Sequence, residues 1–264
     1  MNELTERKTL CDIAHFTFEV VNDWLNDDQI LASELRSSET GSRQFVGEET
    51  ITVDLARKLR TQFHKHTELK LFTHPEEKRT GSDWYWRIER GNHAIHALVQ
   101  AKRVQRTAFG QQDGHGYIDL DYSQLERLLE ATRTASYQIS GLEAWVATYA
   151  RFNATPPCGY SNLQRCRNHT HASDCVNNQS SFWIANAHEI LDAKNWRLSV
   201  REIVQHSVRL DCVLPCIDRL GVSGPAEKGF VLQSDLPSFQ ECVATIENDG
   251  QLYSGLKGAL RIFQ

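Results

Sequence analysis

Apolar residues repeat every three to four positions in two stretches of the first third of the chain. Between residues 5 and 26 the repeated positions are Leu10, Ile13, Phe16, Val20, Val21 and Trp24. In the second stretch they are Ile51, Leu55, Leu59 and Phe63, and either Thr50 or Thr52 is available as an N-cap. This spacing predicts two amphipathic helices. The polar residues 26–47 between them predict a loop.

After the second predicted helix the period changes from four residues to two. Residues 69–74, 83–88 and 94–104 are rich in aromatic and aliphatic side chains, and polar turns with Gly81 and with Gly91-Asn92 separate them. Alternation of this kind is typical of strands. The simplest interpretation is a three-stranded antiparallel meander.

The rest of the chain carries further helix signals and one more strand. Ser123-Gln-Leu-Glu126 fits a capping box and predicts a helix, and residues 142–152 predict a fourth strand. Residues 183–192 predict another helix, as do the capping boxes that begin at Ser199 and Ser238. We therefore expect a mostly helical C-terminal third.

The predicted element order is helix, three strands, helix and strand, flanked by helical segments. It divides the chain into an N-terminal acidic helical arm (1–44), a core (45–155) and a mostly helical extension that contains Cys and His residues (156–264). One continuous domain remains an alternative. The expected fold class is α/β.

Composition and charge set broad limits on the function. The chain has 264 residues, of which 40% are hydrophobic and 24% charged, which is typical of a globular protein. The net charge of −5 conceals an uneven distribution, because residues 1–49 carry a net −7 and residues 50–110 a net +6. A nucleic-acid partner is therefore compatible with the sequence. No apolar run approaches the ~18 residues of a membrane helix, and the charged start lacks a signal-peptide core, so we expect a cytoplasmic protein with no membrane partner.

Three polar residues occupy informative positions on the predicted strands. Gln100 and Lys102 lie on one face of a strand because side chains alternate with a period of two. The Gly91-Asn92 turn can fold Asp83, at the start of the preceding strand, opposite them. Carboxylate and amide oxygens suit a hard ion such as Mg²⁺, and a lysine can stabilise charge on a phosphate. The set favours metal-assisted phosphodiester hydrolysis, against an alternative in which Asp83 caps a turn and Lys102 is a solvated edge lysine.

The residues Gly81-Ser-Asp83 and Gln100-Ala-Lys102-Arg103, with Glu49 at a helix start, resemble the PD-(D/E)XK phosphodiesterase superfamily. The resemblance is to the Mrr-like branch, where glutamine replaces an acid to give a D…QxK motif. It covers roughly residues 45–152 and implies a restriction-endonuclease-like αβββαβ core.

The resemblance implies a role for each matching residue. Asp83 and Gln100 would be ligands of Mg²⁺ or Mn²⁺, Lys102 the catalytic lysine, and Glu49 the acid on the helix, with Glu48 as the alternative. Glu77 is an additional acid that could compensate for the uncharged Gln100. A further candidate is Gln124, at the start of the helix that follows the third strand.

Basic residues around this motif are candidates for contacts with a nucleic-acid backbone: Arg57, Lys58, Arg103 and Arg106. The alternative for those on the helix is an ordinary solvated face.

A separate group of thiols and imidazoles lies within 18 residues and consists of Cys158, Cys166, His169, His171 and Cys175. Three Cys and one His could form a structural Zn²⁺ site, although the spacing matches no standard finger. Reduced buried thiols and a disulfide are the alternatives. A cysteine nucleophile paired with a histidine of this group is a weaker hypothesis.

The leading functional hypothesis is a metal-dependent nuclease acting on DNA. The resemblance alone adds a context of bacterial anti-phage defence or restriction. The alternative is a catalytically inactive nuclease-like fold that acts as a nucleic-acid-binding or assembly module. The sequence leaves open whether a regulatory protein or a homo-oligomer is also involved.

Overall fold

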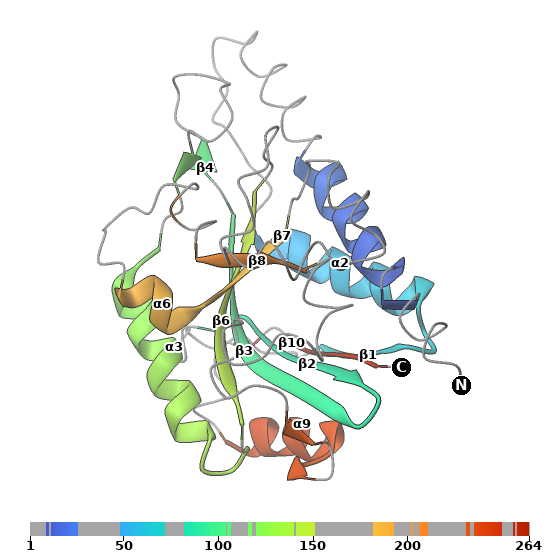
Figure 1. Cartoon of the computed structure of the whole chain (residues 1–264), viewed down its shortest axis with the longest axis vertical. Coiled ribbons are helices and arrows are strands. Elements are labelled where there is room, and N and C mark those ends of the chain that lie inside the picture. The colour runs from blue at the N-terminus through green and yellow to red at the C-terminus, as the bar shows by residue number, and fades with distance from the viewer. Residues whose placement is uncertain are drawn as a thin grey trace, which may run out of the picture.

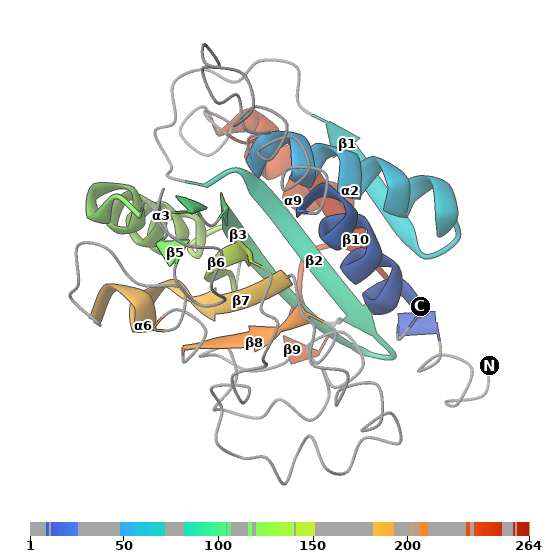
Figure 2. The same cartoon turned by 90° about the horizontal axis from the view of Figure 1, so that it is seen from above.

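A computed structural model of the chain describes residues 9–10, 12–25, 48–71, 82–103, 105–106, 116–117, 120–139, 141–150, 182–192, 202, 206–210, 231–232, 235–249, 256 and 258–263. These residues form a mixed α/β fold in which one β-sheet lies between two layers of helices (Figures 1 and 2). Within these ranges, no helix has both the length and the apolar character needed to cross a membrane.

The described part of the sheet has eight strands, which are mixed in direction. Along the sheet they are β1 (Thr67–Leu71), β10 (Gly258–Ile262), β2 (Trp84–Arg90), β3 (His93–Arg103), β6 (Glu143–Tyr149), β7 (Phe182–Asn186) and β8 (Ser207–Arg209), and β9 (Val231–Leu232) pairs with the start of β3. Two pairs, β10 with β2 and β3 with β6, are parallel. The short strands β4 (Gln105–Arg106) and β5 (Gly116–Tyr117) pair separately.

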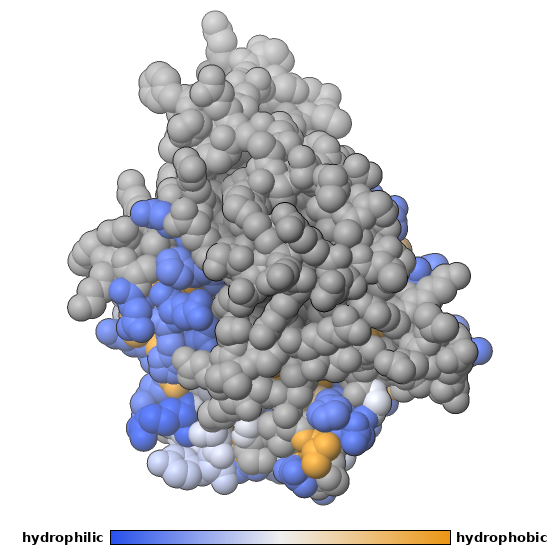
Figure 3. Space-filling model, in the orientation of Figure 1, coloured by the Kyte–Doolittle hydropathy of each residue, from blue (hydrophilic) through white to orange (hydrophobic). Residues whose placement is uncertain are grey.

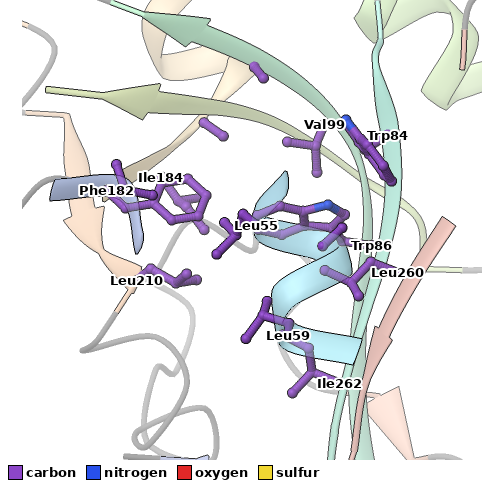
Figure 4. Close-up of a cluster of buried hydrophobic side chains, with 14 of the residues drawn as sticks. Leu55, Leu59, Trp84, Trp86, Val99, Phe182, Ile184, Leu210, Leu260 and Ile262 are labelled. Carbon is purple, nitrogen blue, oxygen red and sulfur yellow. The ribbon is translucent and has the colours of Figure 1, made fainter. Parts of the chain in front are cut away.

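Each face of the sheet has its own hydrophobic core. One core contains Trp84, Trp86 and Val99 from the sheet and lies under α2 (Glu48–Gln62) and the N-terminal helix of residues 9–10 and 12–25 (Figure 4). The other core lies under α3 (Tyr122–Ala135), α6 (Ala187–Asp192) and α9 (Phe239–Asn248). Described residues over α3 and α6 are largely hydrophilic on their outer side (Figure 3). The two faces of β3 therefore meet different helices, which matters for the site described below.

Both helices predicted near the N-terminus are confirmed, and they pack side by side. The indole nitrogen of Trp24 donates a hydrogen bond of 2.7 Å to Asp54 Oδ2, and the rings of Phe16 and Phe63 are in contact. Buried residues of the N-terminal helix belong to the same core as α2, namely Leu10, Ile13, Ala14, Val20, Val21 and Leu25. The predicted loop at 26–47 lies outside the described residues.

The predicted N-cap of α2 is wrong, because the helix begins at Glu48 and both threonines lie inside it. Glu48 and Glu49 are thus in the first turn, as expected for acids near the positive end of the helix dipole. Thr52 is used in the tertiary structure instead, where its hydroxyl is 2.7 Å from the hydroxyl of Tyr149 on β6.

The predicted three-stranded meander is also wrong, although each of its strands forms. β2 and β3 make the expected antiparallel hairpin, but β10 separates β1 from β2. Leu260 and Ile262 of β10 are buried in the core under α2, and Ala259 is buried on the opposite face. β10 is therefore an interior strand of the sheet, next to the edge strand β1.

The C-terminal third is not mostly helical in the residues described, because it contributes β7, β8, β9 and β10. Of the helix predicted at 183–192, the first half is strand β7 and only Ala187–Asp192 is helical. All five residues of β7 are buried, so the alternation that identifies a strand is absent from its sequence. The capping box at Ser238 is confirmed with both of its hydrogen bonds, whereas Ser199 lies outside the described residues.

The helix predicted from Ser123 forms as α3, but Ser123 is not its N-cap. Asp121 caps the helix instead, and its carboxylate accepts hydrogen bonds from the backbone N–H of Ser123 at 2.9 Å and from the Ser123 hydroxyl at 2.6 Å. A capping box at Ser123 is therefore a wrong prediction, because an acid two residues earlier makes the stronger charge-assisted bonds.

We expect Gly258→Ala to lower the free energy of unfolding by about 1–3 kcal/mol, because the added methyl group overfills a packed site. A Cβ atom at this position would lie 2.6 Å from the backbone oxygen of Lys70 and 2.7 Å from the ring of Trp84. Urea denaturation measures the change. Gly91→Ala is the control, since nothing lies within 4 Å of its added Cβ and only the positive φ of 55° costs about 1 kcal/mol. An unchanged midpoint for Gly258→Ala would contradict the close packing of β10 between β1 and β2.

Candidate functional site

The site predicted from the D…QxK motif lies where β2 begins and β3 continues past it. The backbone N–H of Asp83 donates a hydrogen bond of 2.8 Å to Val99 O, which extends the hairpin one residue beyond Trp84. The Asp83 Oδ2 atom accepts a hydrogen bond of 3.0 Å from the backbone N–H of Ala101. A side-chain carboxylate thus takes the place that a main-chain carbonyl would fill in a longer β2.

The Gln100 side chain is held by the same carboxylate. Its Nε2 atom donates to Asp83 Oδ2 and, at 3.0 Å, to the backbone oxygen of Ala101. An amide next to a carboxylate must present its NH₂ group, so these contacts fix the orientation of the amide. The Gln100 Oε1 atom is left buried and has no hydrogen-bond partner among the described residues. Both side chains are almost fully buried, with 1% of Asp83 and none of Gln100 exposed.

Lys102 lies two residues beyond Gln100 and on the same face of β3. Val99 and Ala101 point into the core under α2, so Gln100 and Lys102 point to the face covered by α3. Lys102 is only partly buried, and its positive charge acts on Asp121 at the start of α3. Hydrogen bonds from Ser123 hold the pKa of Asp121 below its ordinary value, and the positive charge of Lys102 acts in the same direction.

The first turn of α2 lies close to the same ends of β3 and β6, on the opposite face. The Thr52–Tyr149 hydrogen bond anchors α2 directly after this turn, and Tyr149 is in register with Arg103 at the end of β3. Glu49 and Glu48 therefore begin a helix that is fixed next to the QxK segment. Their side chains lie outside what the structure describes.

Oxygen donors at this site suit a hard divalent cation. Among the described residues there is no cluster of three or more His, Cys, Asp or Glu side chains able to hold a metal ion. The Asp83 carboxylate nevertheless lies next to the Gln100 side chain, whose Oε1 atom has no hydrogen-bond partner among the described residues. Mg²⁺ is commonly held by only one or two carboxylates together with water and substrate. Asp83 and Gln100 thus supply part of the coordination of such an ion. The predicted further acid, Glu49 or Glu48, begins α2 on the opposite face of the sheet, and the structure does not describe its side chain.

The remaining predicted site residues fall in three groups. Gln124 is buried on α3, which covers the face with Lys102. Arg57 and Lys58 are exposed on α2, and Lys58 forms an ion pair of 2.9 Å with Asp54. Arg103 is partly buried at the end of β3. Arg106 lies on β4, and its side chain is not described. The other predicted residues lie outside the described residues: Glu77, Cys158, Cys166, His169, His171 and Cys175.

Sequence reasoning did not identify Thr148. This residue pairs with Lys102 across the parallel β3–β6 ladder and is fully buried on β6. Its sequence signal is weak, because the strand contains threonine among alanine and valine, as many strands do. Only the register between β3 and β6, which a crossover through α3 sets, places Thr148 beside the motif.

A second buried polar cluster, also missed from the sequence, lies under α9. Glu89 accepts hydrogen bonds from Arg87 at 2.6 Å and from Arg261 at 2.7 Å. Nearby, the Tyr85 hydroxyl is 3.0 Å from His96 Nδ1, and burial raises the pKa of Tyr85 well above its ordinary value. Burial likewise raises the pKa of the buried Cys242 thiol. Neutral Tyr and Cys side chains beside internally paired charges indicate a structural cluster.

Comparison with known proteins gives a family but no characterised relative. A family described as being of unknown function, DUF6615, matches residues 10–253. No curated protein and no solved structure matches the chain. The matched span contains α2, β2, β3, α3 and β6, which carry or flank the site residues, whereas β10 lies beyond it.

Proposed function

We propose that this chain, which belongs to the DUF6615 family, is a metal-dependent nuclease that hydrolyses phosphodiester bonds of DNA. The observation that carries the proposal is the Asp83–Gln100 pair, with Lys102 on the same strand face two residues further along. The order α2, β1, β2, β3, α3 and β6, with the short pair β4–β5 between β3 and α3, supports a restriction-endonuclease-like core, as does the α3 crossover between the parallel strands β3 and β6. A role in anti-phage defence or restriction is part of the same proposal.

The residues divide the proposed chemistry between cation binding and charge stabilisation. Asp83 and Gln100 would hold Mg²⁺ or Mn²⁺, with Glu49 or Glu48 as the further acid. When bound, such an ion supplies Lewis acidity to a phosphodiester. Asp83 also orients the Gln100 amide, because one oxygen of its carboxylate binds the NH₂ group. The Lys102 ammonium stabilises negative charge that develops on the phosphate during attack by water.

The second candidate is a nuclease-like fold without activity, which binds nucleic acid or another protein. Its support is the deep burial of Asp83 and Gln100 and the absence of a three-ligand cluster among the described residues. The Asp83 carboxylate accepts a hydrogen bond from the backbone N–H of Ala101 on β3, and this contact would stabilise the sheet without any metal. DNA binding without cleavage is the outcome that distinguishes this candidate.

We expect the purified chain to nick or linearise plasmid DNA in Mg²⁺ or Mn²⁺, and EDTA to abolish the reaction. Lys102→Ala should lower the rate about a hundredfold, since it removes one charge from the site. The control is Lys70→Ala, at an exposed lysine of β1 that forms an ion pair with Glu247 and should leave the rate unchanged. Gel electrophoresis of time courses measures the cleavage rates of wild type, Lys102→Ala and Lys70→Ala. Wild type and Lys102→Ala that are equally inert across metals, DNA and RNA would remove the enzyme proposal.

A further inference from the structure

Thr148 carries a hydroxyl that the fold buries without giving it a described partner. It lies near the end of β6, which is bordered by β3 on one side and β7 on the other. None of its surface is exposed, and Oγ1 has no hydrogen-bond partner among the described residues. A buried hydroxyl without a partner is destabilising, and valine has nearly the same shape without that cost.

The direction of Thr148 follows from its neighbours on β6. Trp145, Ala147 and Tyr149 belong to the core under α2, whereas Ala144 and Val146 belong to the core under α3. Thr148 therefore points to the α3 face, the face of Gln100 and Lys102. Its register partner on β3 is Lys102, and neighbouring strands lie about 4.8 Å apart.

Two adjacent buried side chains thus have hydrogen-bonding capacity that the described structure does not use. Gln100 Oε1 is a buried acceptor, and Thr148 Oγ1 is a buried donor or acceptor. Beside them, the partly exposed Lys102 supplies a positive charge that also acts on Asp121. The acceptors Asp83 and Gln100 suit a cation, and the donors Lys102 and Thr148 suit an anion. A divalent cation next to a phosphate suits both groups, because the cation binds the acceptors and the phosphate binds the donors.

We propose that Thr148 is a substrate-binding residue whose hydroxyl donates a hydrogen bond to a non-bridging oxygen of the scissile phosphate, beside the Lys102 ammonium. This inference rests on the proposed nuclease function and extends it to a residue outside the D…QxK motif. The ligand class is a phosphodiester. The hydroxyl is retained at a cost in stability because a bound phosphate satisfies it.

The test compares stability with activity in Thr148→Val, Thr148→Ser and a control, Thr67→Val. Thr67 is a buried β1 threonine, remote in sequence, whose hydroxyl donates to Phe63 O at 2.9 Å and to Leu59 O at 3.2 Å. Thr148→Val should keep or raise Tm while kcat/KM for DNA cleavage falls at least about tenfold, mainly through KM. Thr148→Ser should stay within about threefold of wild type. Thr67→Val should lower Tm and leave kcat/KM unchanged.

Inorganic phosphate gives a readout that does not depend on cleavage. Phosphate with Ca²⁺ should raise the Tm of wild type and Thr148→Ser by mass action, and Thr148→Val should lose most of this shift. Cleavage by Thr148→Val at the wild-type rate, in an active protein, would overturn the assignment of Thr148 and leave the nuclease proposal standing. If the wild type cleaves nothing, the nuclease proposal fails. The Tm shift with phosphate then still tests whether Thr148 binds phosphate. Equal Tm shifts in wild type and Thr148→Val, or no shift in either, would reject that role.

Discussion

Asp83→Asn is expected to lower the rate of DNA cleavage on the order of a thousandfold, the scale of losing one preorganised charged group. The substitution removes the only carboxylate that the described structure places against Gln100, and with it most of the attraction for a divalent cation. The amide oxygen of asparagine can still accept from the backbone N–H of Ala101, so β2 and β3 should keep their register. The fold should survive while the metal site does not.

Two measurements separate loss of the metal site from loss of structure. Calorimetric titration with Mn²⁺ should show binding to wild type and much weaker binding to Asp83→Asn, and circular dichroism should show the same fold in both. Asp12→Asn is the charge-matched control, at an exposed position of the N-terminal helix, and should behave as wild type. Full activity in Asp83→Asn would show that this carboxylate only caps the end of β3.

Glu89→Ala is expected to be the most destabilising of the charge substitutions, by about 3–5 kcal/mol, because it leaves the buried guanidinium of Arg87 without its carboxylate. Glu89 and Arg87 are both 3% exposed, and Glu89 also bonds Arg261 on β10. Natural domains have unfolding free energies of only about 5–15 kcal/mol, so such a loss brings the protein close to unfolding.

The comparison for this prediction is an exposed ion pair of the same types. Arg133 bonds Glu130 on α3 with side chains that are 64% and 60% exposed, so Glu130→Ala should leave the denaturation midpoint within error of wild type. Urea denaturation followed by tryptophan fluorescence measures both variants. If Glu89→Ala were as stable as Glu130→Ala, the Arg87–Glu89–Arg261 cluster would not stabilise the packing of β10 in the sheet.

The central part of the site could be predicted because a short turn fixes it. In the hairpin, Arg90 pairs with His93 around Gly91-Asn92, and the same register then continues to Trp84 opposite Val99. Once the turn is recognised, Asp83 must lie opposite Gln100, and the period of two puts Lys102 on the same face. The contacts between Asp83, Gln100 and Ala101 follow from this register.

The pairing of strands that are distant along the chain leaves no pattern in the sequence comparable to the hairpin turn. Thr148 meets Lys102 only after a crossover through α3, and β10 meets β2 from a position more than 160 residues away along the chain. Arg261 of β10 bonds Glu89 on β2 and lies 3.3 Å from Glu68 on β1, so these charges help fix a register that no local pattern encodes.

The sequence by itself determined the elements whose signals are local: two N-terminal helices, the β2–β3 hairpin, strand β6, the capped helix α9 and the alignment of Asp83 with Gln100. The tertiary structure alone decided that β7 is a strand, that β10 lies between β1 and β2 and that Thr148 lies beside Lys102. The physical reason is the range of the interactions. Periodicity, capping and turns act over a few residues, whereas burial on both faces of a strand and pairing across a sheet depend on segments that only folding brings together.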